Sequence, residues 1–112
     1  KISIKKESLM GGMSCDEVSL VPWEILKNSV SHCVTVSDNC ISKTVKYLAN
    51  CEFSNEKIIG GECSTPGIIS LIGMNNDPEI KKKLNLNENS NILLFGCEGD
   101  ADEELYQKLL NE

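Results

Sequence analysis

The chain has 112 residues, the length of one ordinary domain, and 40% of them are hydrophobic, which excludes a disordered polypeptide. It carries 17 acidic residues against 11 basic ones, for a net charge of −6, and every basic residue is a lysine. Nucleic-acid binders normally present a basic face with arginines, so neither a nucleic acid nor an anionic membrane surface is expected as a partner. No apolar run approaches the roughly 20 residues that span a bilayer.

The N-terminus shows no sign of a secretory signal, because it lacks an apolar core segment and an initiator methionine. A start without methionine in so short a chain suggests a fragment of a longer protein. The single histidine, His32, and the scattered cysteines lack the paired spacing of zinc sites, so no metal site is predicted. A partial disulfide set stays an alternative, but we expect most of the six cysteines to be small buried apolar side chains in a reducing cytosol.

Two kinds of segment alternate along the chain. Residues 2–4 are predicted to be a short extended piece, and short aliphatic or β-branched runs predict strands over 33–36, 57–59 and 91–95. First-turn prolines, capping residues and apolar faces at helical spacing predict helices that begin near Val21, Ser37, Ser64 or Thr65, Asp77 and Asp100. Strands that alternate with helices form βαβ units, so we expect residues 1–112 to be one α/β segment, a parallel sheet with helices on both faces.

Two turns stand where the predicted strands end, which is where ligands bind in such sheets. The first turn, 60–64 (GGECS), follows the strand at 57–59, and the second, 96–100 (GCEGD), follows the strand at 91–95. A glycine pair lets the backbone approach a ligand, and the helix after Ser64 favours an anion, although no phosphate-loop motif is present. The alternative for the first turn is a plain helix entry.

Cys97 in the second turn has three open roles. As a nucleophile it lacks a base nearby in the sequence, because His32 is far away. The second role is that of an ordinary buried core cysteine. The third is a hydrogen bond to the ring nitrogen of a cofactor, for which the small polar sulfur is sufficient. The acidic residues that follow it, through Glu104, are expected to be a solvated helix start.

Four blocks of the sequence occur in the order seen at the C-terminal end of diaminopropionate ammonia-lyases. These blocks are 12–17 (GMSCDE), 22–26 (PWEIL), 59–62 (IGGE) and 86–100 (LNENSNILLFGCEGD), the last being the most specific. The chain therefore resembles the C-terminal part of the large domain of these enzymes. They are fold type II enzymes that use pyridoxal 5′-phosphate, as do threonine dehydratase and cysteine synthase.

The resemblance implies an α,β-elimination that converts 2,3-diaminopropionate to pyruvate and ammonia. It also implies that Cys97 meets the pyridine nitrogen of the cofactor, with Glu62 close to the ring and Gly60 and Gly61 in the same cofactor-binding turn. Two departures are visible. Cys-Ser-Thr at 63–65 replaces the Ser-Gly-Ala common in the family, and Cys97 replaces a threonine.

The Schiff-base lysine and the phosphate-binding loop of such enzymes lie outside these blocks, so no catalytic residue is predicted in this chain and we expect it to be inactive alone. The resemblance implies a cytoplasmic homodimer of amino-acid catabolism. Its partners would be a small amino-acid substrate and the remainder of the lyase chain. Two alternatives stay open: a cofactor-free interaction or regulatory module, and part of a threonine or serine dehydratase. The run Glu-Gly-Asp-Ala-Asp at 98–102 disfavours the threonine or serine dehydratase.

Overall fold

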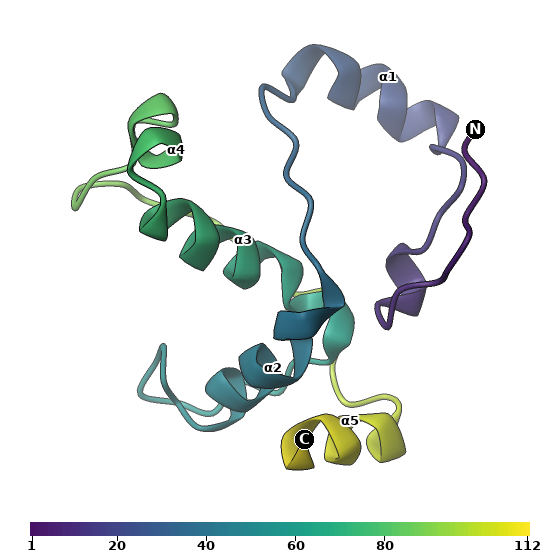
Figure 1. The fold of residues 1–112 in the computed structure, drawn as a ribbon, viewed down its shortest axis with the longest axis vertical. Helices are drawn as coiled ribbons and strands as arrows, with labels where there is room; N and C mark the ends of the chain where they lie inside the picture. Colours follow the sequence, from purple (N-terminus) through teal and green to yellow (C-terminus); the bar gives the residue numbers. More distant parts are fainter.

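A computed structural model describes all 112 residues and consists of helices, turns and extended segments, with 48% helix and no strand (Figure 1). The elements in chain order are η1 (Gly11–Met13), α1 (Leu20–Ser29), η2 (Asp38–Cys40), α2 (Ile41–Ala49), η3 (Glu62–Ser64), α3 (Pro66–Asn76), α4 (Pro78–Lys83) and α5 (Glu103–Asn111). No helix combines the length and the apolar character that crossing a membrane requires.

The five predicted helices are confirmed as α1 to α5, and the local chemistry explains most of their starts. Proline occupies the first turn of α3 and of α4, where its missing N–H is not needed. The Asp77 carboxylate caps α4 by accepting hydrogen bonds from two backbone N–H groups, and Asp102 caps α5 through the N–H of Leu105 at 2.9 Å. Ser37 makes no capping bond, because η2 stands between it and α2.

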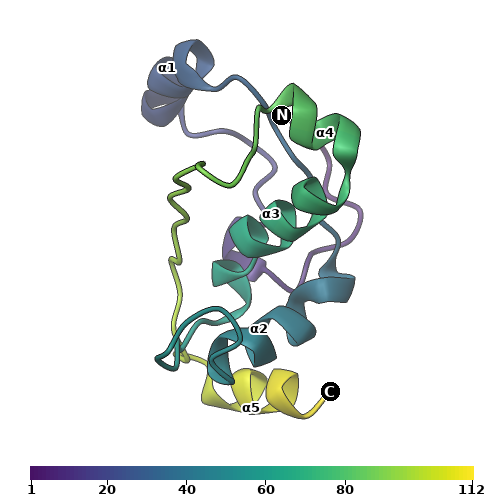
Figure 2. The ribbon, with the colours of Figure 1, turned by 90° about the vertical axis from the view of Figure 1, so that its left-hand side faces the viewer.

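The predicted α/β fold is wrong. None of the segments 2–4, 33–36, 57–59 and 91–95 forms a strand, and no backbone hydrogen bond joins any two of them. The prediction failed because β propensity says which residues fit a sheet, and not whether the chain supplies a neighbouring strand. Figure 2 shows the segment at 91–95 running from α4 towards α5 along one side of the molecule. Its side chains are exposed, Leu93 by 77%.

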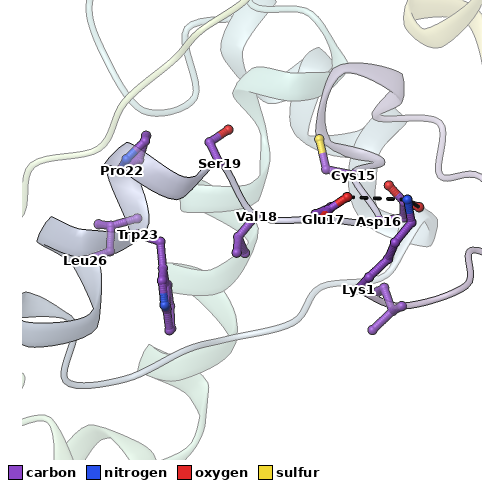
Figure 3. A pocket seen from close by; sticks show the side chains of 10 residues that line it. Lys1, Cys15, Asp16, Glu17, Val18, Ser19, Pro22, Trp23 and Leu26 are labelled. Carbon is purple, nitrogen blue, oxygen red and sulfur yellow. Dashed lines mark hydrogen bonds and ion pairs between the residues drawn. The ribbon is translucent and has the colours of Figure 1, made fainter.

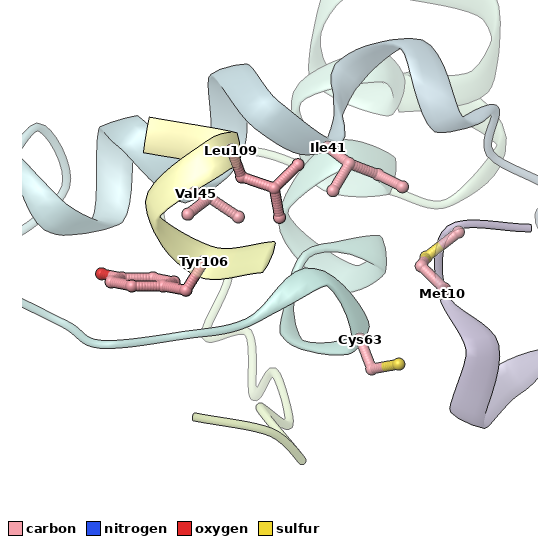
Figure 4. Close-up of a cluster of buried hydrophobic side chains, with 6 residues drawn as sticks. All are labelled: Met10, Ile41, Val45, Cys63, Tyr106 and Leu109. Atoms are coloured by element: carbon pink, nitrogen blue, oxygen red, sulfur yellow. The ribbon is translucent and has the colours of Figure 1, made fainter. Parts of the chain in front are cut away.

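The hydrophobic core is a small cluster where α2 meets α5 and η3 (Figure 4). The predicted apolar face of α2 is confirmed, since Ile41, Val45 and Leu48 are buried, and Tyr106 and Leu109 of α5 are buried with them. Only 12 of the 112 residues are buried. The radius of gyration is 15.4 Å, against about 13 Å for a compact domain of about 100 residues. The structure is therefore open around this core.

Candidate functional site

The two glycine-containing turns singled out in the sequence lie against each other. The N–H of Gly61 donates a hydrogen bond to the carbonyl oxygen of Glu98 at 3.1 Å. A Cβ atom on Gly61 would overlap the carbonyl oxygen of Gly99, and one on Gly60 would lie 3.1 Å from the Leu48 side chain. Both glycines are buried. Gly61 is therefore needed for the close approach of the two turns, and Gly60 for the packing of the first turn against Leu48 of α2. The two turns lie next to each other without a sheet.

Ser64 and Glu98 join the turns by reciprocal hydrogen bonds. The Ser64 hydroxyl accepts from the backbone N–H of Glu98 at 3.0 Å and donates to the Glu98 carbonyl oxygen at 2.5 Å. The Glu98 carboxylate in turn accepts from the backbone N–H of Cys63 at 3.0 Å. Glu98 is thus held at its amide, its carbonyl and its side chain.

The side chains of Glu62, Cys63 and Glu98 converge, with their candidate ligand atoms all within 4.8 Å of one another. Burial raises the pKa of the Cys63 thiol to about 11, and its hydrogen bond to Glu98 adds to the shift. Burial also raises the pKa of Glu62, and the nearby charge of Glu98 acts in the same direction. A thiol with two carboxylates has ligand types that zinc accepts, but the thiol must lose its proton to bind. At neutral pH Cys63 keeps that proton, which opposes metal binding.

Cys97 lies on the surface of the second turn, and its thiol donates a hydrogen bond to the carbonyl oxygen of Cys63 at 3.3 Å. The core role considered for Cys97 is therefore wrong. His32 is exposed and its ring contacts the Ser31 hydroxyl, so it supplies no base to this thiol. The role as a partner of a cofactor ring stays a prediction.

The expectation that most cysteines are buried is also wrong. Cys63 alone is buried, and the exposed cysteines are Cys15, Cys33, Cys40, Cys51 and Cys97. Most of these residues sit outside the α2–α5 cluster, where the chain offers little to cover an apolar side chain.

Ser64 and Glu98 are the residues of the site that the sequence analysis missed. The sequence predicts a helix cap at Ser64 or Thr65 and a solvated acidic stretch that includes Glu98. In the structure Thr65 occupies the N-cap position of α3, and neither hydroxyl caps the helix. One sequence feature could have identified Ser64 and Glu98. Each of the two turns, which were expected to meet, carries a hydrogen-bonding side chain close to a glycine.

A separate pocket lies along α1 and the segment before it (Figure 3). Its volume is about 460 Å³, and its lining includes Trp23 and Leu26 at one end and Asp16 and Glu17 at the other. The Lys1 ammonium pairs with both acids at 3.4 Å. The pocket involves the GMSCDE and PWEIL blocks and none of the four predicted cofactor-binding residues.

The paired turns fit one part of a pyridoxal 5′-phosphate and not another. The Cys97 thiol offers a small polar group on an accessible surface, as an edge of the pyridine ring needs. The charged groups that influence Glu62 and Cys63 are carboxylates, and no lysine is among them. A phosphate group needs cations or a cradle of N–H groups, so these turns suit the ring and not the phosphate.

Comparison with known proteins connects the chain to one enzyme. It is 28% identical over 108 residues to the diaminopropionate ammonia-lyase of Escherichia coli strain K12, and equally to that of E. coli O157:H7. The Salmonella typhimurium enzyme of the same name is 22% identical over 108 residues. These alignments cover 94% and 92% of this chain but only 27% and 26% of the relatives. The chain therefore spans about a quarter of their length.

No family model and no solved structure matches the chain. The similarity to the curated relatives nevertheless extends over nearly the whole sequence. The resemblance to part of a diaminopropionate ammonia-lyase is thereby confirmed.

Proposed function

We propose that this chain is the C-terminal part of a pyridoxal-phosphate-dependent lyase that eliminates ammonia from 2,3-diaminopropionate and yields pyruvate. The observation that carries the proposal is the 28% identity, over 94% of the chain, with enzymes named for that reaction. The two apposed turns support it, since the residues with the proposed cofactor role belong to them. Other lyases of amino acids with a β-leaving group are the nearest competitors.

The residues that would hold the cofactor ring in this proposal are Cys97 and Glu62, placed by the backbone approach at Gly60 and Gly61. When bound, pyridoxal phosphate supplies an electron sink for the elimination. Cys97 would offer its thiol to the ring nitrogen, which requires its present hydrogen bond to Cys63 to be exchanged. Glu62 would stand beside the ring, where burial raises the pKa of its carboxyl group.

The phosphate clamp and the Schiff-base lysine are assigned to parts of the lyase outside this chain. The relatives are long enough for that, because the chain spans 27% of them. The same missing parts would cover the apolar side chains exposed on α1 and at 91–95, where Leu20, Val21 and Phe95 are each more than three-quarters exposed. The isolated chain is therefore expected to be inactive. We further propose that the whole enzyme is a cytoplasmic homodimer.

The test is pyruvate release from 2,3-diaminopropionate by the native protein that contains this chain, purified from the source cell and supplied with pyridoxal phosphate. We expect release with 2,3-diaminopropionate that clearly exceeds release with serine, while threonine yields little oxo acid. Faster turnover of serine or threonine would move the assignment to a dehydratase. The isolated 112-residue chain is the matched control, and turnover by it would contradict the missing-part proposal.

A cofactor-free binding module is the second candidate function. The observation that favours it is that the charged side chains acting on Glu62 and Cys63 are carboxylates, and no lysine is among them. A native product of only 112 residues that neither binds pyridoxal phosphate nor releases pyruvate would establish this reading against the lyase.

A further inference from the structure

We propose that Ser64 is a positioning residue for Cys97, acting through the peptide group that joins Cys97 to Glu98. The cofactor role of Cys97 rests on the proposed function, whereas the positioning by Ser64 rests on hydrogen bonds in this structure. Ser64 is buried and comes 34 residues before Glu98 in the chain. Its hydroxyl therefore fixes a contact that no local sequence preference provides.

The hydroxyl of Ser64 has one proton and two lone pairs, and Glu98 uses both kinds of group. The hydroxyl donates to the Glu98 carbonyl oxygen and accepts from the Glu98 N–H. It thereby pairs with Glu98 as the backbone of a neighbouring strand would. The N–H of Glu98 belongs to the peptide plane that follows Cys97. Holding that N–H restrains this plane, which is one of the two flanking peptide groups that set the orientation of Cys97.

Cys97 is held a second time, by the hydrogen bond from its thiol to the carbonyl oxygen of Cys63. Both restraints on Cys97 therefore start from neighbouring residues, 63 and 64. The backbone at both glycines lies beside the Ser64 side chain, because a Cβ on Gly96 would lie 3.4 Å from Ser64 Oγ and one on Gly60 would lie 3.2 Å from Ser64 Cβ. Glycine at 60 and 96 thus leaves room for the Ser64 side chain between the turns.

The hydrogen bonds that hold the two turns together are not the ones that orient Cys97. If Ser64 becomes alanine, the bonds from Gly61 N–H and from Cys63 N–H to Glu98 remain, so the turns stay together. The Glu98 amide loses its partner, so one of the two restraints on Cys97 is removed and only the thiol bond to Cys63 is left. The expected loss is one of orientation at Cys97 and not of the fold.

The experiment compares the unmodified 112-residue chain with Ser64→Ala, Ser64→Thr and the control Ser70→Ala by NMR. In Ser64→Ala we expect the Hα–Hβ couplings of Cys97 to change from those of one rotamer to averaged values. We also expect Glu98 amide exchange to become about tenfold faster, the effect of losing about one hydrogen bond. Ser64→Thr retains the hydroxyl and should restore both readouts, and Ser70→Ala should change neither.

Two results would overturn the proposal. One is a Cys97 that keeps the couplings of a single rotamer in Ser64→Ala. The other is faster exchange by the same factor throughout α2 and α5, which indicates a purely structural role. If Ser64→Ala does not fold, Ser64→Cys keeps the volume with a weaker hydrogen-bonding group and is judged by the same two readouts. Pyruvate release tests the lyase proposal separately, so the two can fail independently.

Discussion

The chain contains a packed region and an open region, although apolar residues occur in both. In the packed region α2, α5 and η3 bury their apolar faces against one another, and Ile41 and Leu109 are 0% and 1% exposed. In the open region α1 has no buried residue, and the segment at 91–95 is exposed throughout. The difference between the two regions shows that an apolar run is buried only where another element of the same chain packs against it. Apolar composition by itself does not form a core.

The largest predicted effect is a difference in unfolding free energy between the two regions when a leucine in each is replaced by alanine. Leu109→Ala removes a side chain buried between α5 and α2, so it should lower the free energy of unfolding by about 2–5 kcal/mol. Leu93→Ala removes an exposed side chain and should change it by about 0.5 kcal/mol or less. Urea unfolding followed by circular dichroism measures both. Equal losses would show that the two regions do not differ in packing.

Gly61→Ala should have the next largest effect. The new Cβ overlaps the carbonyl oxygen of Gly99, a backbone atom that cannot rotate away, so the two turns must separate. The expected cost is about 1–3 kcal/mol, in the range of overpacked sites. Gly11→Ala is the matched control, because no atom lies within 4 Å of its Cβ position. A Gly61→Ala chain as stable as Gly11→Ala would contradict the close approach of the turns.

The two helix-capping aspartates offer a second comparison between the packed region and the open region. Asp102→Ala removes the cap of α5, which carries buried Tyr106 and Leu109, so a loss of about 1 kcal/mol should appear in global unfolding. Asp77→Ala removes the cap of α4, which has no buried residue, so α4 should fray while global stability stays the same. Residue-resolved amide exchange distinguishes local from global loss. Serine at either position, which also caps, should restore the original behaviour.

The smallest predicted effect depends on pH and concerns the attachment of the N-terminal segment at Asp38. Hydrogen bonds from the Ser8 hydroxyl at 2.6 Å and from the Leu9 N–H at 2.9 Å lower the pKa of Asp38 below its ordinary value of 3.8. Because the folded-state pKa is depressed, the stabilisation is fully present above pH 3.8 and is lost as the pH falls through the folded value. The Leu9 amide signal should therefore move only in acid.

The control for this pH dependence is Asp38→Asn, which removes the charge. Its Leu9 amide should be insensitive to pH across the acid range where the unmodified chain changes. A transition of Leu9 near pH 6 in the unmodified chain would show that a different group controls the attachment.

Helices could be predicted from the sequence because their signals are local. The prolines at 66 and 78, the aspartate at 77 and the apolar spacing of 41, 45 and 48 each act within one or two turns of the chain. The predicted sheet is wrong, because the runs at 33–36 and 91–95 fit a strand only if another strand lies beside them. The structure gives neither run such a neighbour.

The site could be predicted in part. Attention to glycine turns after aliphatic runs identified both turns, and the structure places Gly61 against Glu98 and Gly99. The bonding between Ser64 and Glu98 could not be predicted, because it depends on a contact between residues far apart in the sequence. The raised pKa of the Cys63 thiol has the same origin, since burial and Glu98 are both tertiary features.

The most direct test of the account is residue-resolved amide exchange of the 112-residue chain at neutral pH. The account predicts strong protection within α2 and α5, clear protection of the Glu98 amide by Ser64, and exchange close to the unstructured rate at 91–95. Protection of 91–95 as strong as that of α2, together with an unprotected Glu98, would contradict it. That result would mean that a paired strand, and not the Ser64 contact, holds the second turn in place.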